Sequence, residues 1–154
     1  MAIILHQPTH PIPRTDLLIS EEFIVEVLTK FRGSLNWRNK SFPPEVQTML
    51  TYIHDHFFDR TLTVQGVKEA CGFANNNVTS TFKQFVGVGP REYIANLRLT
   101  AASSVLGNGD VNIYLLAGAV GYTEEAFSRI FKKSFGCTPT QYCKQNAKTN
   151  GQEK

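Results

Sequence analysis

The sequence predicts an all-α protein with two helix-turn-helix units joined by a central linker helix, preceded by an extra N-terminal helical segment. The main observation is a repeat, because one pattern occurs twice, 49 residues apart and without a gap. Apolar residues outside the repeat also recur at helical spacing, and no convincing strand pattern follows residue 20. The matched positions are Val64, Val67, Gly72, Phe73, Phe82, Lys83, Gly87, Pro90 and Tyr93 in the first copy, and Ile113, Leu116, Gly121, Tyr122, Phe131, Lys132, Gly136, Pro139 and Tyr142 in the second.

Length, composition and cysteine count limit the class of protein. At 154 residues and 42% apolar residues, the chain suits one globular domain plus an extra segment. Its three cysteines, Cys71, Cys137 and Cys143, are odd in number and lack CxxC spacing, which favours reduced thiols over disulfides or a zinc site. The apolar run from Ala2 to Leu5 is too short for a signal peptide or a membrane span. The protein is therefore expected to be cytoplasmic.

Charge is distributed unevenly along the chain. Residues 1–59 carry five Lys/Arg against seven Asp/Glu, whereas residues 60–154 carry eleven against six. The part that contains the repeats is thus the basic part, which suits a polyanion as partner. Taken alone, so modest an excess is more often an ordinary solvated surface.

Residues 1–42 are expected to form an arm and one helix of unknown role. Residues 1–19 are proline-rich and aperiodic, as in a linker. An apolar stripe then predicts a helix from Ser20 that ends at Gly33. Its members are Phe23, Ile24, Val27, Leu28 and Phe31. A helix of this length is marginal in water, so we expect its stripe to pack on the same chain, with self-association as the alternative.

The tandem helix-turn-helix domain is expected to occupy residues 43–145, followed by a tail over 146–154. Pro43 and Pro44 favour a helix start, and the stripe that follows consists of Val46, Met49, Leu50, Ile53 and Phe57. The first unit is expected at about 43–92 and the second at 107–145. Between them the pattern predicts a linker helix over 93–106, with Ile94, Leu97, Leu99, Ala102, Val105 and Leu106 available for burial.

Each repeat predicts a helix, a tight turn and a second helix. Thr63 and Asn112 are suited to cap the first helices, and Gly72 and Gly121 supply the left-handed residue that ends them. The second helix of each unit has an apolar face, formed by Val78, Phe82 and Phe85 in one copy and by Phe127 and Phe131 in the other. The opposite faces are polar: Asn76, Thr79, Ser80 and Lys83 in the first, and Glu125, Ser128, Arg129 and Lys132 in the second.

These residues resemble the DNA-binding domain of AraC/XylS-type transcriptional regulators. The resemblance covers roughly residues 43–145 and is carried by the repeat positions, by Arg98-Leu99-x-x-Ala102 in the linker, and by Phe127-Ser128-Arg129-x-Phe131-Lys132-Lys133 in the second unit. It implies two recognition helices that enter neighbouring major-groove segments of one DNA site. Carried over by position, the residues that face the bases are Asn76, Thr79 and Ser80 in the first unit and Glu124, Glu125 and Arg129 in the second.

Several of these residues have alternative roles. Asn76 suits adenine, which an Asn side chain contacts through two hydrogen bonds, and the alternative for the run Asn75 to Asn77 is helix capping or plain exposure. Glu124 and Glu125 could accept from cytosine, but acids in a first helical turn also stabilise the helix dipole. Arg129 either reads guanine or pairs with Glu125 four residues earlier. Three lysines are expected to contact phosphates, with a general contribution to solubility as the alternative: Lys83, Lys132 and Lys133.

The sequence departs from the family at a few positions. Lys68 stands where the second copy has Ala117, at a close approach of two helices, so either its stem snorkels to solvent or the first unit is looser. Residues 1–42 are too few for the sensor domain that most regulators of this type carry. The chain is therefore expected to be a stand-alone member or a trimmed one.

The sequence indicates a sequence-specific transcriptional regulator. An activator is expected because the resembling family mostly activates, with double-stranded DNA and RNA polymerase as partners and with the protein binding DNA as a monomer. The alternative is a protein-interaction adaptor that keeps the fold without reading DNA. No cofactor is expected, since the pattern contains no phosphate loop or catalytic dyad, and His54 and His56 diverge too far on a helix to share a metal. An enzyme is not expected.

Overall fold

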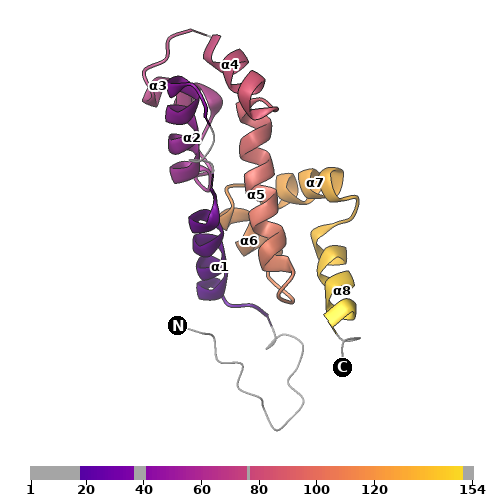
Figure 1. The fold of residues 1–154 in the computed structure, drawn as a ribbon. Coiled ribbons are helices and arrows are strands. Elements are labelled where there is room, and N and C mark those ends of the chain that lie inside the picture. The colour runs from indigo at the N-terminus through magenta and orange to yellow at the C-terminus, as the bar shows by residue number, and fades with distance from the viewer. Residues whose placement is uncertain (1–17, 37–40, 76, 151–154) are drawn as a thin grey trace, which may run out of the picture.

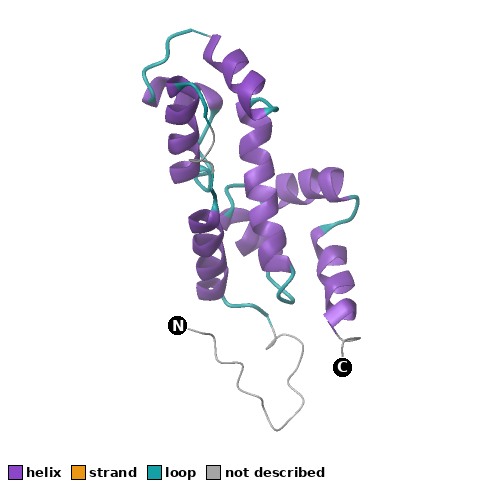
Figure 2. Ribbon diagram, in the orientation of Figure 1, coloured by secondary structure: helices purple, strands orange, loops and turns teal. Residues whose placement is uncertain are grey.

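The computed structural model describes residues 18–36, 41–75 and 77–150, with side chains described as far as Asn146. The described residues contain helices and no strand, apart from one isolated bridge between Ile19 and Val111 (Figure 2). The all-α prediction is therefore confirmed. The helices are α1 (Glu21–Ser34), α2 (Pro44–His56), α3 (Val64–Ala70), α4 (Asn77–Val86), α5 (Pro90–Leu106), α6 (Ile113–Ala119), α7 (Glu124–Phe135) and α8 (Pro139–Asn150).

Helix α5 is the axis of the molecule (Figure 1). Helices α2, α3 and α4 gather around its amino-terminal end, and α6, α7 and α8 around its carboxyl-terminal end. Helix α1 lies along the lower part of α5 and also contacts α6. The two helix-turn-helix units are thus placed at opposite ends of one long helix.

The two units repeat each other in their turns as well as in their sequence. Thr63 accepts a hydrogen bond from the Gly66 amide at 3.0 Å, and Asn112 accepts one from the Leu115 amide at 3.3 Å, so both predicted caps are confirmed. After α3, the Phe73 amide donates to the Lys68 carbonyl, and after α6 the Tyr122 amide donates to the Ala117 carbonyl, both at 2.8 Å. These bonds close each helix in the same manner.

An aromatic pair anchors the second helix of each unit to the helix that follows. The ring centroids of Phe82 and Tyr93 lie 5.6 Å apart at 74°, and those of Phe131 and Tyr142 lie 5.5 Å apart at 84°. Both are edge-to-face contacts, which aromatic quadrupoles favour. Positions 49 residues apart therefore have the same tertiary role as well as the same residue types.

The linker helix is longer than the sequence predicted. It begins at Pro90 rather than at residue 93, because proline lacks the amide proton that the first turn of a helix leaves unused. Its 17 residues span about 26 Å. The same rule places Pro139 at the start of α8, and this helix runs to Asn150, past residue 145 where the second unit was expected to end.

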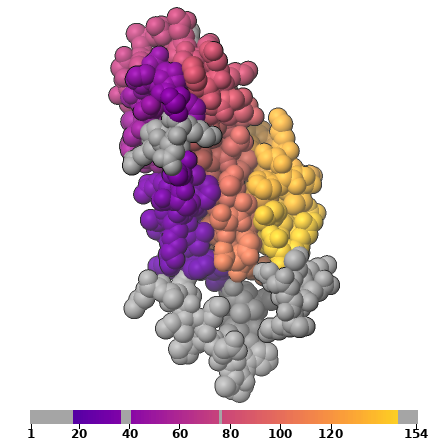
Figure 3. Space-filling model, in the orientation of Figure 1, coloured from indigo at the N-terminus to yellow at the C-terminus, as the bar shows by residue number. Residues whose placement is uncertain are grey.

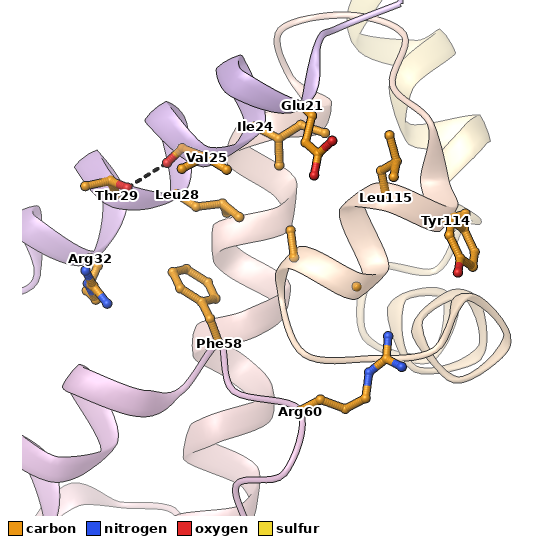
Figure 4. Close-up of a pocket in the computed structure, with 12 residues that line it drawn as sticks. Glu21, Ile24, Val25, Leu28, Thr29, Arg32, Phe58, Arg60, Tyr114 and Leu115 are labelled. Atoms are coloured by element: carbon orange, nitrogen blue, oxygen red, sulfur yellow. Dashed lines mark hydrogen bonds between the residues drawn. The ribbon is translucent and has the colours of Figure 1, made fainter.

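Helix α1 packs on the same chain, as predicted from its stripe. Ser20 caps it, accepting from the Phe23 amide at 3.3 Å, and Ile24 and Leu28 are buried against the common core. Phe23, Val27 and Phe31 are half-buried. In Figure 3 the indigo surface of α1 lies directly beside the orange surface of α5. An open groove of about 460 Å³ remains between α1, residues 58–60 and α6 (Figure 4).

The structure corrects the prediction for Phe85 and decides between the two alternatives for Lys68. Phe85 was predicted on the buried face of α4 with Val78 and Phe82, but it is 45% exposed, because the buried stripe continues from Phe82 to Val86 at i+4 and leaves Phe85 beside it. Lys68 is 5% exposed and Val67 beside it is fully buried. The first unit therefore closes around the lysine stem, and the lysine is not held out in solvent.

One histidine and one cysteine, His54 and Cys143, are buried in the core. His54 is buried, and its Nε2 lies 2.6 Å from the Tyr93 hydroxyl. All three cysteines are free thiols, and Cys143 is buried with its Sγ 3.4 Å from the Gly109 carbonyl oxygen.

Within the described residues, no helix is both long and apolar enough to cross a membrane.

The seat of α1 can be tested with two substitutions in that helix. Leu28→Ala should lower the free energy of unfolding by ~2–5 kcal/mol, since it leaves a cavity at a side chain that is 4% exposed. Val25→Ala is the matched control, because Val25 is 55% exposed on the same helix and should change stability by no more than about 0.5 kcal/mol. Urea denaturation of both variants gives the comparison. Equal, small effects would show that α1 does not contribute its apolar face to the core.

Candidate nucleic-acid interface

Helix α7 presents the most strongly charged face among the predicted site residues. Thr123 caps the helix by accepting from the Ala126 amide at 3.3 Å, and Gly136 ends it in the left-handed conformation at φ 77°. Phe127 and Phe131 are fully buried and hold one side of the helix in the core. The predicted site residues lie on exposed positions of the same helix: Glu124, Glu125, Arg129, Lys132 and Lys133.

Helix α4 presents the corresponding face of the first unit. Val78 and Phe82 are buried, while Ser80 and Lys83 are exposed and Thr79 is half-buried. Asn76, the remaining predicted base contact of this unit, lies outside the described residues. No acidic side chain stands in the first turn of α4, in contrast to the two glutamates of α7.

The structure bears on the alternative roles of the α7 residues. Glu124 and Glu125 occupy the first turn of α7, where carboxylates stabilise the helix dipole. Among the described residues, no ion pair joins Glu125 and Arg129, although they lie four residues apart on one helix, the spacing at which Lys30 and Glu26 pair at 2.9 Å in α1. The Arg129 guanidinium is thus available to a ligand.

A contact between the two units was not predicted from sequence. It is formed by Arg98 of α5, by residues 57–60 after α2, and by the turn Gly121–Tyr122 that precedes α7. The Arg98 guanidinium donates to the Phe57 and Asp59 carbonyls and lies 4.9 Å from the centre of the Tyr122 ring. In the sequence, Arg98 stands out only as a motif position of the linker. The available signal was an arginine between Leu97 and Leu99, inside an apolar stripe.

Burial keeps two further titratable groups near this scaffold neutral. It raises the pKa of Tyr93 to about 12, so the hydroxyl stays protonated beside His54. Burial, with a smaller effect of Asp110, raises the pKa of the Cys143 thiol to about 11. Neither group is poised as a nucleophile at neutral pH.

The sequence model of a family described as a helix-turn-helix domain matches residues 69–145, which is half of the chain. The chain belongs to the AraC-type helix-turn-helix family. The predicted family is therefore confirmed. The match includes α4, the linker helix and the whole second unit, so both exposed faces belong to AraC-type positions.

Individual AraC-type relatives agree with this assignment. The HTH-type transcriptional regulator AlkR of Acinetobacter baylyi is 30% identical over 112 residues, which cover 72% of this chain and 36% of AlkR. The C-terminal domain of AraT, a response regulator from Geobacillus stearothermophilus, superposes with a TM-score of 0.66 at 29% identity, covering 69% of this chain and 88% of that domain.

A third comparison concerns the fold alone. The DNA-binding domain of AdpA, a global transcriptional factor solved in complex with a target DNA, has a TM-score of 0.64 at 16% identity, covering 71% of this chain and 99% of that domain. The two-unit architecture is therefore shared with AdpA. The chain spans about a third of the length of the curated AraC-type relatives that it matches, 36% for AlkR.

Proposed function

We propose that this protein is a sequence-specific transcriptional regulator that binds double-stranded DNA through α4 and α7. The observation that carries the proposal is that one AraC-type chain holds two equivalent helix-turn-helix units, each with a polar face exposed on its second helix. A helix of this kind fits the major groove of B-DNA, where base edges are distinguishable. The AdpA domain, which has the same fold, was solved on its target DNA.

The two helices are proposed to contribute unequally to base recognition. On α7, Arg129 has the reach and the planar donor fork to contact guanine through two hydrogen bonds. On α4, Thr79 and Ser80 are short and neutral, so they discriminate bases only where the helix backbone lies close to the groove floor. Asn76 is proposed to contact adenine. Glu124 and Glu125 are proposed to face the same groove. Their carboxylates can accept hydrogen bonds there from the amino group of cytosine.

The lysines are proposed to hold the protein on the DNA backbone. Lys83 and Lys132 occupy matched positions of the repeat, and both are exposed. Lys133 adds a third positive charge beside Lys132. Such contacts fix the register of the helices on the duplex and give the binding its dependence on salt.

The remaining parts of the proposal concern the whole protein. We propose that the regulator activates transcription in the cytoplasm, with RNA polymerase as a further partner. Residues 43–145 are proposed as the DNA-binding domain, residues 1–42 as an accessory segment and residues 146–154 as a tail. The seating of α1 on α5 and α6 supports an accessory role, since α1 contributes to the core that carries α7.

An adaptor that binds protein instead of DNA is the second candidate. It is favoured by Glu124 and Glu125, which expose two carboxylates at the start of the very helix that would approach the phosphates. The deciding experiment is selection of enriched sequences from random double-stranded DNA at low salt. Enrichment of a motif supports the regulator, and recovery of no motif supports the adaptor.

The first prediction of this proposal is that one chain binds an asymmetric site. The covalent repeat already supplies two reading helices, which dimeric repressors obtain from two-fold symmetry. The two contacted major-groove segments should lie about 34 Å apart, roughly one turn of B-DNA. Selection followed by sedimentation of the complex measures both points. A palindromic motif occupied by two chains would contradict this prediction.

The second prediction concerns base reading by Arg129. Arg129→Ala should change the preferred sequence and cost ~1–3 kcal/mol on the matched site, with a much smaller loss on a site already mismatched at that base. Asn76→Ala should relax one base of the other half-site with a smaller loss of affinity. Titration of each variant on matched and single-mismatch sites gives the answer. Should Arg129→Ala weaken every site equally, Arg129 contacts the backbone.

The third prediction concerns the phosphate contacts. Lys83→Ala and Lys132→Ala should weaken binding to all sequences alike, and each should lower the slope of log affinity against log salt by about one. Lys30→Ala serves as the control, because Lys30 lies on α1 and pairs with Glu26. Affinities at two salt concentrations are sufficient. An altered sequence preference without a change of slope would assign these lysines to base contacts.

A further inference from the structure

The two units touch directly, and the linker helix alone does not explain how they are held. We call this contact the joint and define it as Arg98, the loop of residues 57–60, and the turn Gly121–Tyr122. The loop belongs to the first unit and the turn belongs to the second. Figure 4 shows Phe58 and Arg60 leaving the loop on the side of α1 and α6. Because Thr123 caps α7 directly after the turn, the joint fixes the point at which α7 begins.

Arg98 is the centre of the joint. It is only 6% exposed, yet its Nε donates to the Phe57 carbonyl at 2.5 Å and its Nη2 donates to the Asp59 carbonyl at 2.6 Å. The Cζ of the same guanidinium lies over the Tyr122 ring. A planar fork makes all three contacts at once, which a lysine ammonium does not.

The positive charge of Arg98 is met by the carboxyl end of α2. Phe57 is the C-cap of that helix, and its carbonyl is one of those that a helix leaves without an internal partner. A cation is favoured at this end by the helix dipole. The bond to Arg98 thus ties the end of α2 to the middle of α5.

The loop has a fixed shape on its own side. The Asp59 carboxylate accepts from the Thr61 amide at 2.9 Å and from the Thr61 hydroxyl at 2.7 Å. These bonds hold the pKa of Asp59 below its usual value, through the Thr61 side chain first and its backbone second. Arg60 then crosses to the second unit and donates to the Tyr122 carbonyl at 3.1 Å.

Gly121 shows how closely the units approach. A Cβ added there would lie 2.9 Å from the Arg98 Cζ and 3.0 Å from the Phe58 carbonyl oxygen. Gly72, at the matched position of the first unit, has a similar left-handed backbone, with φ 78° against 95°, but nothing lies within 4 Å of its added Cβ. The tight approach is therefore specific to the joint and is not a general property of the turn.

We infer that Arg98 is a positioning residue that fixes the orientation of α7 relative to α4 and so sets the spacing between the two DNA segments that the chain reads. The part that concerns DNA rests on the proposed function. One added base pair moves a half-site by about 3.4 Å and rotates it by roughly 35° around the duplex. A rigid joint tolerates neither displacement, whereas a loosened joint accommodates both.

The test compares affinity for sites whose two halves have the selected spacing with affinity for sites that have one base pair more or fewer. Arg98→Lys keeps the charge but loses the fork, and it should reduce the spacing preference by about tenfold, as expected for roughly one hydrogen bond to a charged group. Gly121→Ala should reduce it as well, because its methyl group displaces the guanidinium. Gly72→Ala carries a comparable backbone strain away from the joint and should leave the preference unchanged.

The outcomes separate positioning from stability. Thermal unfolding is measured on every variant, and a variant that unfolds earlier but retains the wild-type spacing preference overturns the inference. If Arg98→Lys does not fold, the Gly121→Ala and Gly72→Ala pair decides the question. Equal spacing preferences in that pair would also overturn it.

A measurement without DNA keeps this inference distinct from the proposed function. Spin labels at the exposed positions Gln84 on α4 and Ser134 on α7 report the distance between the two helices, in a chain whose native cysteines are replaced by alanine. Arg98→Lys should broaden the distance distribution relative to the parent chain. Broadening in a protein that binds no DNA would refute the proposed function and support the joint, whereas an unchanged distribution would refute the positioning role.

Discussion

A buried guanidinium holds the architecture of this protein together. Arg98 contacts the Phe57 carbonyl at the end of α2, the Asp59 carbonyl in the following loop and the ring of Tyr122, so a single side chain connects the linker helix to both helix-turn-helix units. A buried cation without hydrogen-bond partners is costly, and this one is stable only while both carbonyls and the ring stay in place. The relative position of the two units is consequently fixed by buried contacts as well as by the linker helix.

The repeat is symmetric in its local structure and asymmetric in its tertiary contacts. Caps, left-handed glycines and edge-to-face aromatic pairs are the same in both copies. The environments of the matched residues differ, since Lys68 is buried where the second unit has Ala117, and Gly121 is crowded where Gly72 is open. The turn of the first unit is therefore open to solvent, whereas the matching turn of the second unit packs against the first unit. The turn inside the helix-turn-helix forms part of the joint only in the second unit, which carries the more charged exposed helix.

Helix α1 adds to the core without occupying the exposed faces of α4 and α7. Its apolar stripe contacts α5 and α6, the helices that support the second unit from behind. Since a lone amphipathic helix is marginal in water, this packing is what keeps α1 folded, and in return it covers apolar surface of α5. Helix α1 therefore supports the core beneath α7 while the exposed face of α7 stays accessible.

The sequence by itself determined the fold class, the family, both caps, the glycine turns, and the buried stripes of α2 and α5. Each depends on contacts within a few residues or on a period that local geometry enforces, so the pattern is visible in the chain. The tertiary structure decided the burial of Arg98, the exposure of Phe85, the seat of α1, and the absence of an Arg129–Glu125 ion pair among the described residues. The decisive bonds link residues 41 positions apart for Arg98 and Phe57, and 62 positions apart for Arg60 and Tyr122. Sequence periodicity does not predict such bonds, because they form only when the two units, each predictable by itself, pack against each other in space.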